Sequence, residues 1–281
     1  MRPSSLAVIG LGAIGGSLAW QARRAGVARV VGYSPSRAEA VEALKASAIT
    51  EMADTPGRAV RGAELVVLAV PPRATIDLIG RLGPALEPGA VLTDVCSVKQ
   101  PVMARAAEAA LAARFAGGHP LAGTHDSGFE AARPDRLRGC VVYVCELPGG
   151  GDRPARGVMG FWREVLEAEP ILIDAAAHDR QLAWTSHLPQ AVAYALAHAL
   201  AERRLGGVSF GTGARDTTRL AASSPEMWLD IMLLNRPALD DALERTGAAL
   251  AELRALLAAG DAEGLERYLA DAREFRRGMD R

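Results

Sequence analysis

In LAVIGLGAIGGSLAW, residues 6–20, an apolar run leads into three spaced glycines and then a helical pattern. In a dinucleotide-binding turn, the first glycine (Gly10) makes the turn tight, the second (Gly12) lets a pyrophosphate approach the backbone, and the third (Gly15) lets helix and strand pack closely. The helix start would offer free N–H groups to the phosphates. A second β-branched run at 28–34 follows at the spacing of a βαβ unit. A glycine-rich structural turn is the alternative. The residues predicted to hold the cofactor are Gly10, Leu11, Gly12, Ala13, Ile14 and Gly15.

The pattern of alternating strands and helices continues through residue 174. Apolar runs separated by amphipathic segments are typical of a parallel sheet covered on both faces, so we expect an α/β Rossmann-type doubly wound domain over residues 1–174. A turn rich in glycine and proline is expected at 146–157. The predicted strands are 6–12, 28–34, 64–72, 90–96, 140–145 and 170–174, and the predicted helices lie near 14–25, 36–46, 74–83, 98–113 and 157–168.

Residues 175–281 have a different character, with apolar residues at helical spacing and almost no strand signal. Pro189 and Pro237 should bend or break long helices there. We therefore expect a second, all-helical domain over 175–281. Its abundant apolar residues suggest a further buried face, which favours a homodimer formed through this domain.

The overall composition excludes several classes of function. The 281 residues carry a net charge of −1, which gives no basic field for nucleic acid or an anionic membrane. The longest apolar runs, such as 65–70, are far shorter than the roughly 20 residues of a membrane span. Three cysteines without CxxC spacing are typical of free thiols in a reducing compartment. A strand pattern begins where a signal peptide would need its apolar segment. We expect a cytoplasmic protein with a small-molecule substrate.

The end of the second predicted strand bears on the choice of cofactor. An acidic residue normally holds the adenosine ribose there, and this chain has Ser34, with Arg37 shortly after it. Serine does not repel a 2′-phosphate and arginine can pair with one, so the sequence favours NADP over NAD. Arg37 as a solvated surface side chain is the alternative. Val70 and Pro71, at the end of the next strand, are predicted to lie near the nicotinamide, or simply to end the strand.

Four polar clusters remain once the cofactor turn is set aside. DVCSVK (94–99) follows a predicted strand, and GGHPLAGTHDSG (117–128) follows the strand-like ARFAG, so both are expected in loops at the ligand-facing edge of the sheet. HDRQLAWTSHLPQ (178–190) and ARDTTRLAASSPEMWLDIMLLN (214–235) lie on predicted helices. None of the histidine spacings matches a common zinc or iron site, so we expect no metal.

These clusters, with GLGAIGGS, occur in the order and approximate spacing of the prephenate/arogenate dehydrogenase family of tyrosine biosynthesis, which the chain resembles over essentially its whole length. The resemblance implies a Rossmann domain followed by a helical dimerisation domain. It also implies an oxidative decarboxylation with NAD(P)+, which converts prephenate to 4-hydroxyphenylpyruvate or arogenate to tyrosine.

The resemblance also implies roles for single residues. His119 would be the catalytic group at the substrate's 4-hydroxyl, assisted by Ser97, and histidine suits a base that works near neutral pH. Arg219 would hold a substrate carboxylate, since its planar fork donates two parallel hydrogen bonds. A structural loop histidine and an arginine paired with Asp216 are the alternatives. The remaining residues expected to line the substrate pocket are Thr124, His178, Ser186 and His187.

Two positions depart from the family pattern. His125 stands where the family often has an acidic residue at the pocket entrance, and Gln190 stands where it often has a histidine near the substrate's side chain. Glutamine can both donate and accept, so it suits a keto or an amino side chain. The choice between prephenate and arogenate therefore stays open.

Three other interpretations of the sequence stay open. One is another two-domain NAD(P)-dependent dehydrogenase, of the β-hydroxyacid or pyrroline-5-carboxylate reductase type, although these lack HPLAGT and RDTTRLA. The second is a non-catalytic NADP-binding sensor, which needs neither His119 nor Arg219. The third is a metal enzyme using His119, His125, His178 and Asp126, which the spacing disfavours.

Overall fold

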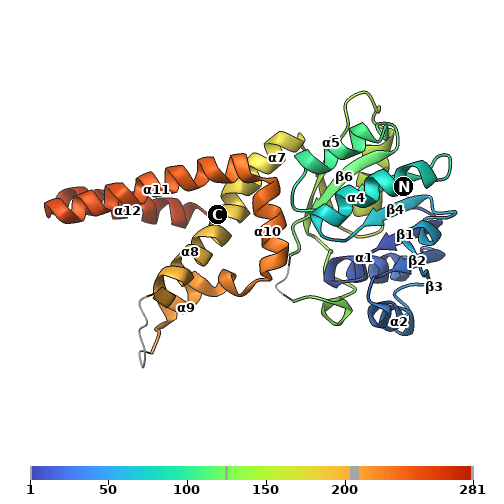
Figure 1. Ribbon diagram of the computed structural model, residues 1–281, viewed down its shortest axis with the longest axis horizontal. Coiled ribbons are helices and arrows are strands. Elements are labelled where there is room, and N and C mark those ends of the chain that lie inside the picture. The colour runs from blue at the N-terminus through green and yellow to red at the C-terminus, as the bar shows by residue number, and fades with distance from the viewer. Residues whose placement is uncertain (1, 124–125, 203–208, 280–281) are drawn as a thin grey trace. The chain divides into compact units, whose positions relative to one another are not determined.

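The computed structural model describes residues 2–123, 126–202 and 209–279 (Figure 1). The chain divides into two compact units, residues 1–235 and 236–281. Thr124 and His125, both predicted to line the substrate pocket, lie outside the described residues.

The first unit is built on one eight-stranded sheet with the order β3-β2-β1-β4-β5-β6-β7-β8. The first six of these strands pair in parallel, which confirms the Rossmann-type doubly wound sheet predicted from the sequence. β7 runs antiparallel to β6, and β8 runs parallel to β7, so the expectation of a wholly parallel sheet is wrong at this edge. The strands are β1 (Ser5–Ile9), β2 (Arg29–Tyr33), β3 (Glu51–Met52), β4 (Leu65–Leu68), β5 (Val91–Asp94), β6 (Phe115–Pro120), β7 (Val141–Glu146) and β8 (Glu169–Leu172).

β6 changes the local setting of His119. The sequence places this residue in a loop, but it lies inside the strand, two positions after Gly117. Glycines weaken the strand signal in a sequence, and here close packing requires them. A Cβ on Gly118 would lie 2.6 Å from the backbone oxygen of Asp94, and one on Gly117 would lie 2.8 Å from the sulfur of Met103. β6 can therefore approach β5 closely enough to fix His119 on a rigid element.

Helices cover both faces of the sheet because side chains alternate along each strand. In β1, Leu6 and Val8 face one apolar core while Ala7 and Ile9 face the other. α1, α2 and α6 contribute to the first core, and α3, α4 and α5 contribute to the second. These helices are α1 (Ala13–Arg24), α2 (Arg37–Lys45), α3 (Pro56–Ala59), α4 (Pro72–Leu82), α5 (Gln100–Glu108) and α6 (Arg153–Glu164).

The described residues after Asp174 are helical apart from short connections such as 209–211, 223–224 and 260–261. A π-helical turn, Ala183–His187, interrupts the helix before Pro189, which lacks an N–H and lies at the second position of the helix that follows. Pro237 likewise lies at the start of its helix. After Asp174, the first unit continues with the helices α7 (Ala175–Leu182), α8 (Leu188–Glu202), α9 (Thr212–Thr218) and α10 (Pro225–Leu234).

The second unit is a pair of helices, α11 (Arg236–Ala259) and α12 (Ala262–Gly278). Gly260, with φ of +63°, ends α11, and the Asp261 carboxylate accepts the Gly264 N–H to begin α12. Several large apolar side chains of this pair are exposed, among them Leu250, Leu257, Leu269 and Phe275. In the part of the chain that the structure describes, no helix combines the length and apolarity that crossing a membrane requires.

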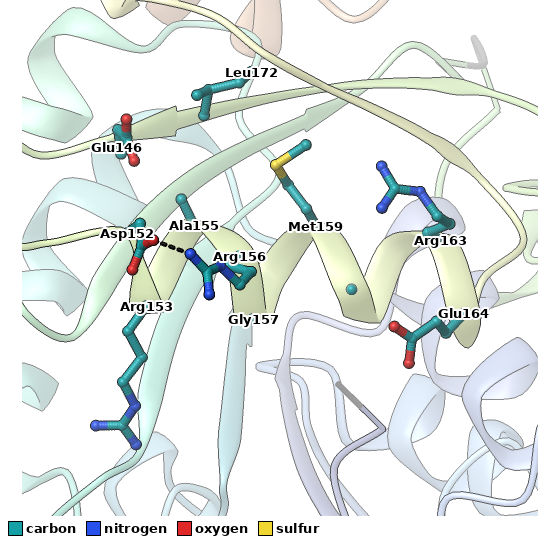
Figure 2. Close-up of a pocket in the computed structure, with 11 residues that line it drawn as sticks. Glu146, Asp152, Arg153, Ala155, Arg156, Gly157, Met159, Arg163, Glu164 and Leu172 are labelled. Carbon is teal, nitrogen blue, oxygen red and sulfur yellow. Dashed lines mark hydrogen bonds and ion pairs between the residues drawn. The ribbon is translucent and has the colours of Figure 1, made fainter.

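A surface cavity of about 650 Å³ lies beside α6, and charged side chains of that helix, among them Arg153, Arg156 and Arg163, line it (Figure 2). Glu146 at the end of β7 and Leu172 at the end of β8 contribute to its wall, and Asp152 pairs with Arg156 across one turn of α6. Among the described residues, none that is predicted to bind substrate or cofactor lines this cavity. Those residues lie elsewhere in the fold.

Candidate active site

The glycine turn after β1 has the shape of a dinucleotide cradle. Gly10 has φ of +100°, and a Cβ there would lie 2.2 Å from the Ala69 oxygen. A Cβ on Gly15 would lie 1.9 Å from the Gly10 oxygen, so both positions require glycine. Gly12, by contrast, borders open space and caps α1 without a side-chain hydrogen bond. The open N-terminus of α1 fits a pyrophosphate, and Leu11, Ala13 and Ile14 lie on the same turn.

Val70 and Pro71 lie beside this cradle, at the end of β4. The Cγ1 of Val70 would lie 2.8 Å from a Cβ on Gly10, which shows how near the two loops are. The Thr75 hydroxyl donates to the Val70 carbonyl over 3.1 Å, and Pro71 caps α4. The structure therefore brings both residues to the edge of the sheet where the sequence predicts the nicotinamide.

The end of β2 carries an acidic group that the strand motif does not contain. The Ser34 hydroxyl donates to the Glu39 carboxylate over 2.6 Å, and Glu39 comes from the first turn of α2. Arg37 is exposed, and its guanidinium lies 3.9 Å from Asp54. Glu39 is not apparent as a candidate in the sequence, because the acidic residue of this motif normally stands at the end of the strand itself.

A buried ion pair fixes the ends of β5 and β6 to each other. The Lys99 ammonium pairs with the Asp94 carboxylate and donates to the Gly118 carbonyl over 2.7 Å. The other Asp94 oxygen accepts the Gly118 N–H over 3.1 Å. Lys99 and Asp94 are fully buried. Because Gly118 precedes His119, the pair holds the backbone of that histidine.

Three buried side chains form a hydrogen-bonded chain that ends at His119. The Nδ1 atom of His119 lies 2.8 Å from Nε2 of His178, and Nδ1 of His178 lies 2.8 Å from the Asp179 carboxylate. Asp179 also accepts the backbone N–H groups of Lys99 and Gln100 over 2.7 and 2.8 Å. The chain thus joins β6, α7 and the start of α5.

The carboxylate at one end of this chain determines where the protons lie. Asp179 can only accept, so His178 carries its proton on Nδ1 and presents the lone pair of Nε2 to His119. His119 must then carry its proton on Nδ1. Its Nε2 is left as a hydrogen-bond acceptor. In the neutral protein, the chain therefore gives His119 one basic nitrogen with a defined position.

Burial keeps these groups in the forms that this arrangement needs. Burial lowers the pKa of His119 well below its usual value, and the neighbouring His178 and Lys99 lower it further. Burial also lowers the pKa of His178, against the opposing effect of Asp179. For Asp179, burial raises the pKa, but hydrogen bonds from His178 and two backbone amides outweigh it and hold the pKa below its usual value.

A third buried histidine, His187, has the opposite tautomer. The Asn235 amide nitrogen donates to the Asp179 carbonyl over 2.8 Å and to Nδ1 of His187 over 3.0 Å. The Nε2 of His187 therefore carries the proton, and this buried atom has no hydrogen-bond partner among the described residues. Burial lowers the pKa of His187 to about 4, so the ring stays neutral and offers a free N–H donor.

The other predicted substrate residues are brought together less closely. Gln190 is buried, and its amide nitrogen donates to the Leu220 carbonyl over 2.6 Å. Leu220 directly follows Arg219 in the sequence, so this hydrogen bond links Gln190 to the segment that carries Arg219. Arg219 is exposed and forms no ion pair with Asp216 or with any other described residue. Ser97 is half-buried in the loop between β5 and α5, and Ser186 is half-buried in the π-helical turn.

Sequence reasoning missed the residues that organise the site. Asp94, Asp179 and Asn235 stand inside the motifs but received no role, because each also bonds a residue far along the chain. These partners are Gly118, Lys99 and His187, which lie 24, 80 and 48 residues away. A signal was present in the HD pair at 178–179, since an acidic neighbour often orients a catalytic histidine. Across residues 2–123, 126–202 and 209–279, no group of three or more His, Cys, Asp or Glu side chains is placed to hold a metal ion.

The geometry defines a class of protein. A dinucleotide cradle accepts a hydride carrier, and a buried imidazole with a fixed basic nitrogen accepts the proton of an alcohol that loses the hydride. Together they are typical of a two-domain dehydrogenase that oxidises a hydroxyl-bearing carbon.

Comparison with known proteins gives the family. Residues 18–165 match the nucleotide-binding domain of prephenate dehydrogenase, and residues 174–271 match the dimerization domain of that enzyme. The chain belongs to the prephenate dehydrogenase family, and this excludes the β-hydroxyacid type as its family. It is 32% identical over 288 residues to prephenate dehydrogenase of Bacillus subtilis, covering 98% of this chain and 76% of the relative. It is 33% identical over 282 residues to cyclohexadienyl dehydrogenase of Zymomonas mobilis, covering 96% and 94%.

Solved structures agree with this assignment. The crystal structure of prephenate dehydrogenase from Aquifex aeolicus in complex with hydroxyphenyl propionate and NAD+ superimposes with a TM-score of 0.91 at 29% identity, covering 98% of both chains. Synechocystis arogenate dehydrogenase superimposes with a TM-score of 0.83 at 27% identity, covering 98% and 99%. A nucleotide-binding domain of this kind binds a nicotinamide dinucleotide.

Proposed function

We propose that this protein catalyses the oxidative decarboxylation of prephenate, arogenate or both, as a step of tyrosine biosynthesis. The observation that carries the proposal is the Asp179–His178–His119 chain, which gives a buried base a defined basic nitrogen. The names of relatives that span almost the whole chain support it, since they include prephenate, cyclohexadienyl and arogenate dehydrogenases.

His119 acts on the proton of the substrate's 4-hydroxyl. As the ring carbon loses its hydride, the hydroxyl proton moves to Nε2 of His119 and a ketone forms. The ring carboxylate then leaves as CO2, its bonding electrons enter the ring, and the oxygen takes the proton back from His119 to become a phenol. The positive charge that His119 holds in between is stabilised by Asp179 through His178. Ser97 assists at the same hydroxyl.

The remaining polar groups hold the substrate's charges and side chain. Arg219, which has no ion pair within the described part of the chain, grips a carboxylate through its planar fork. The unpartnered Nε2–H of His187 donates to a second acceptor on the substrate. Gln190 keeps its amide oxygen for the substrate's side chain while its nitrogen bonds Leu220. Ser186 lines the pocket, and Thr124 and His125 remain predictions from the sequence.

The nicotinamide dinucleotide supplies the hydride acceptor for this reaction. Residues 10–15 would hold its pyrophosphate at the open N-terminus of α1, and Val70 and Pro71 would border its nicotinamide. Ser34 would face the adenosine ribose. The sequence favours NADP through Ser34 and Arg37, but the carboxylate beside Ser34 favours NAD.

The helical part of the chain, residues 175–281, forms the dimer as well as part of the pocket. The match of residues 174–271 to a dimerization domain supports this division and a homodimer. The exposed Leu257 on α11 and Leu269 on α12 are apolar area that a second copy would cover. Light scattering should give twice the mass of the chain, and Leu257→Glu should halve it while Arg254→Ala does not. A monomeric wild-type protein would contradict this assignment.

Steady-state kinetics tests the reaction. Adding a nicotinamide dinucleotide and prephenate, or the dinucleotide and arogenate, should raise the absorbance of the reduced nicotinamide, and the ratio of the two kcat/KM values assigns the substrate. The aromatic product should form in equal amount with CO2. Binding of the dinucleotide without turnover of either substrate would overturn the proposal and leave the sensor hypothesis.

A further inference from the structure

A negative charge lies beside Ser34, in the turn between β2 and α2, although Ser34 itself is uncharged. Glu39 enters from the first turn of α2, and its Oε2 atom accepts the Ser34 hydroxyl proton over 2.6 Å. Ser34 directly follows β2, the position from which an acidic residue normally reaches the adenosine ribose. The Glu39 carboxylate therefore lies 2.6 Å from the Ser34 oxygen. It brings a negative charge close to the position where the carboxylate of an aspartate at residue 34 would lie.

The Ser34 hydroxyl has no hydrogen-bond donor available for a phosphate. Its hydroxyl oxygen accepts the Ser36 N–H over 3.2 Å, and its single proton goes to Glu39. Ser34 is buried, so the hydroxyl cannot turn to solvent without losing both bonds. Serine at this site consequently orients the carboxylate and does not act as a phosphate donor.

The Glu39 carboxylate is held in place and has one open side. The Glu39 backbone N–H donates to the Ser36 hydroxyl over 3.4 Å, and this N-cap fixes the start of α2. The Glu39 Oε1 atom accepts no hydrogen bond from the described residues, and the Glu39 side chain is only half-buried. A carboxylate oxygen without a partner can accept hydrogen bonds from ribose hydroxyls.

The nearby cation does not neutralise this charge. Arg37 is exposed and lies nearest Asp54, at 3.9 Å, and Asp54 also pairs with Arg58 at 3.2 Å. A 2′-phosphate at the ribose would therefore meet Glu39 at short range, where like charges repel strongly even beside solvent.

We propose that Glu39, oriented by Ser34, selects NAD over NADP by accepting the adenosine ribose hydroxyls and repelling a 2′-phosphate. The proposal rests on the proposed function only for the presence of a dinucleotide in the cradle, and it is independent of the substrate.

Calorimetric titration of the substrate-free protein with NAD+ and NADP+ tests the proposal. The wild-type protein should bind NAD+ at least about tenfold more tightly than NADP+, because NAD+ has no 2′-phosphate for Glu39 to repel. Glu39→Gln should shift the ratio of dissociation constants toward NADP+ by about tenfold, mainly by tightening NADP+. Glu42→Gln removes the same charge one turn further along α2 and should leave the ratio unchanged.

Two further measurements separate the possible failures. Adenosine 2′,5′-bisphosphate should compete for the cradle less well than AMP, and Glu39→Gln should abolish the difference. A wild-type preference for NADP+, or a loss of NADP+ binding in Arg37→Gln with no effect of Glu39→Gln, would overturn the role of Glu39 and leave the proposed reaction untouched. Failure to bind either dinucleotide would overturn both proposals.

Discussion

The cofactor cradle and the histidine cluster are built in opposite ways. The cradle is one short contiguous turn in which Gly10 and Gly15 meet close backbone contacts and Gly12 stays open. The histidine cluster draws Lys99, His119, Asp179 and Asn235 from four distant segments and buries them. The cradle works by backbone shape, and the cluster works by hydrogen bonds that fix protons. A local feature survives changes elsewhere in the fold, whereas a buried network depends on every member.

The largest expected effect is at His119. His119→Asn should lower kcat by about 10²- to 10⁴-fold, because it removes the base that accepts the hydroxyl proton. The dissociation constant for NAD+ should not change, since the cradle is a separate structure. In the wild-type protein, kcat/KM should stay level as pH falls through 6.5 and decline only below it, because burial lowers the pKa of His119 well below its usual value. Wild-type turnover in the His119→Asn variant would contradict the assignment.

A smaller effect is expected at Asp179, the carboxylate end of the Asp179–His178–His119 chain (the relay). Asp179→Asn can turn an N–H toward His178, which reverses both tautomers and leaves His119 without a basic Nε2. We expect kcat to fall by about 10- to 100-fold, the scale of a lost orienting partner, with unchanged NAD+ binding and a changed pH profile. Because the amide also faces two backbone N–H groups, a stability loss of about 1–3 kcal/mol should accompany this.

Asp174→Asn is the matched control, since Asp174 caps the same helix through the Ala177 N–H at 2.9 Å and does not touch the relay. Asparagine is an equally good cap, so activity and stability should both be retained. If Asp179→Asn lowers stability but leaves kcat and the pH profile intact, Asp179 is only structural.

The buried His187 ring should make the protein less stable at low pH. Burial lowers the pKa of His187 to about 4, whereas the unfolded chain titrates it near 6.5. Between these values the unfolded state binds the extra proton, so the free energy of unfolding should fall as pH falls through this window, by about 3 kcal/mol from this group. Urea unfolding at several pH values measures the slope.

The slope should be smaller in His187→Gln, because glutamine can accept from Asn235 and does not titrate. His198→Gln is the control, since His198 lies exposed on α8 beside Glu202 and should leave the slope unchanged. Equal slopes in the wild-type protein and His187→Gln would show that the buried ring is not responsible.

The contrast between the two regions also explains what could be predicted. The doubly wound sheet, the glycine turn and most helices are visible in the sequence, because strand and helix periodicity and turn glycines act over a few residues. The sequence predicts a loop at the end of β6 because Gly117 and Gly118 hide its strand pattern. The reversal of β7 is not visible in the sequence either, because strand direction depends on which neighbour a strand pairs with.

The doubly wound sheet, the cradle at residues 10–15 and the candidate histidine could be recognised in the sequence, because they depend on local pattern and on motifs in fixed order. The folded structure was needed to show which nitrogen of His119 is basic, which nitrogen of His187 donates, and that Glu39 supplies the charge at Ser34. The physical reason is that a hydrogen bond or a charge acts at a few ångströms in space, and these partners lie 5 to 59 residues apart along the chain.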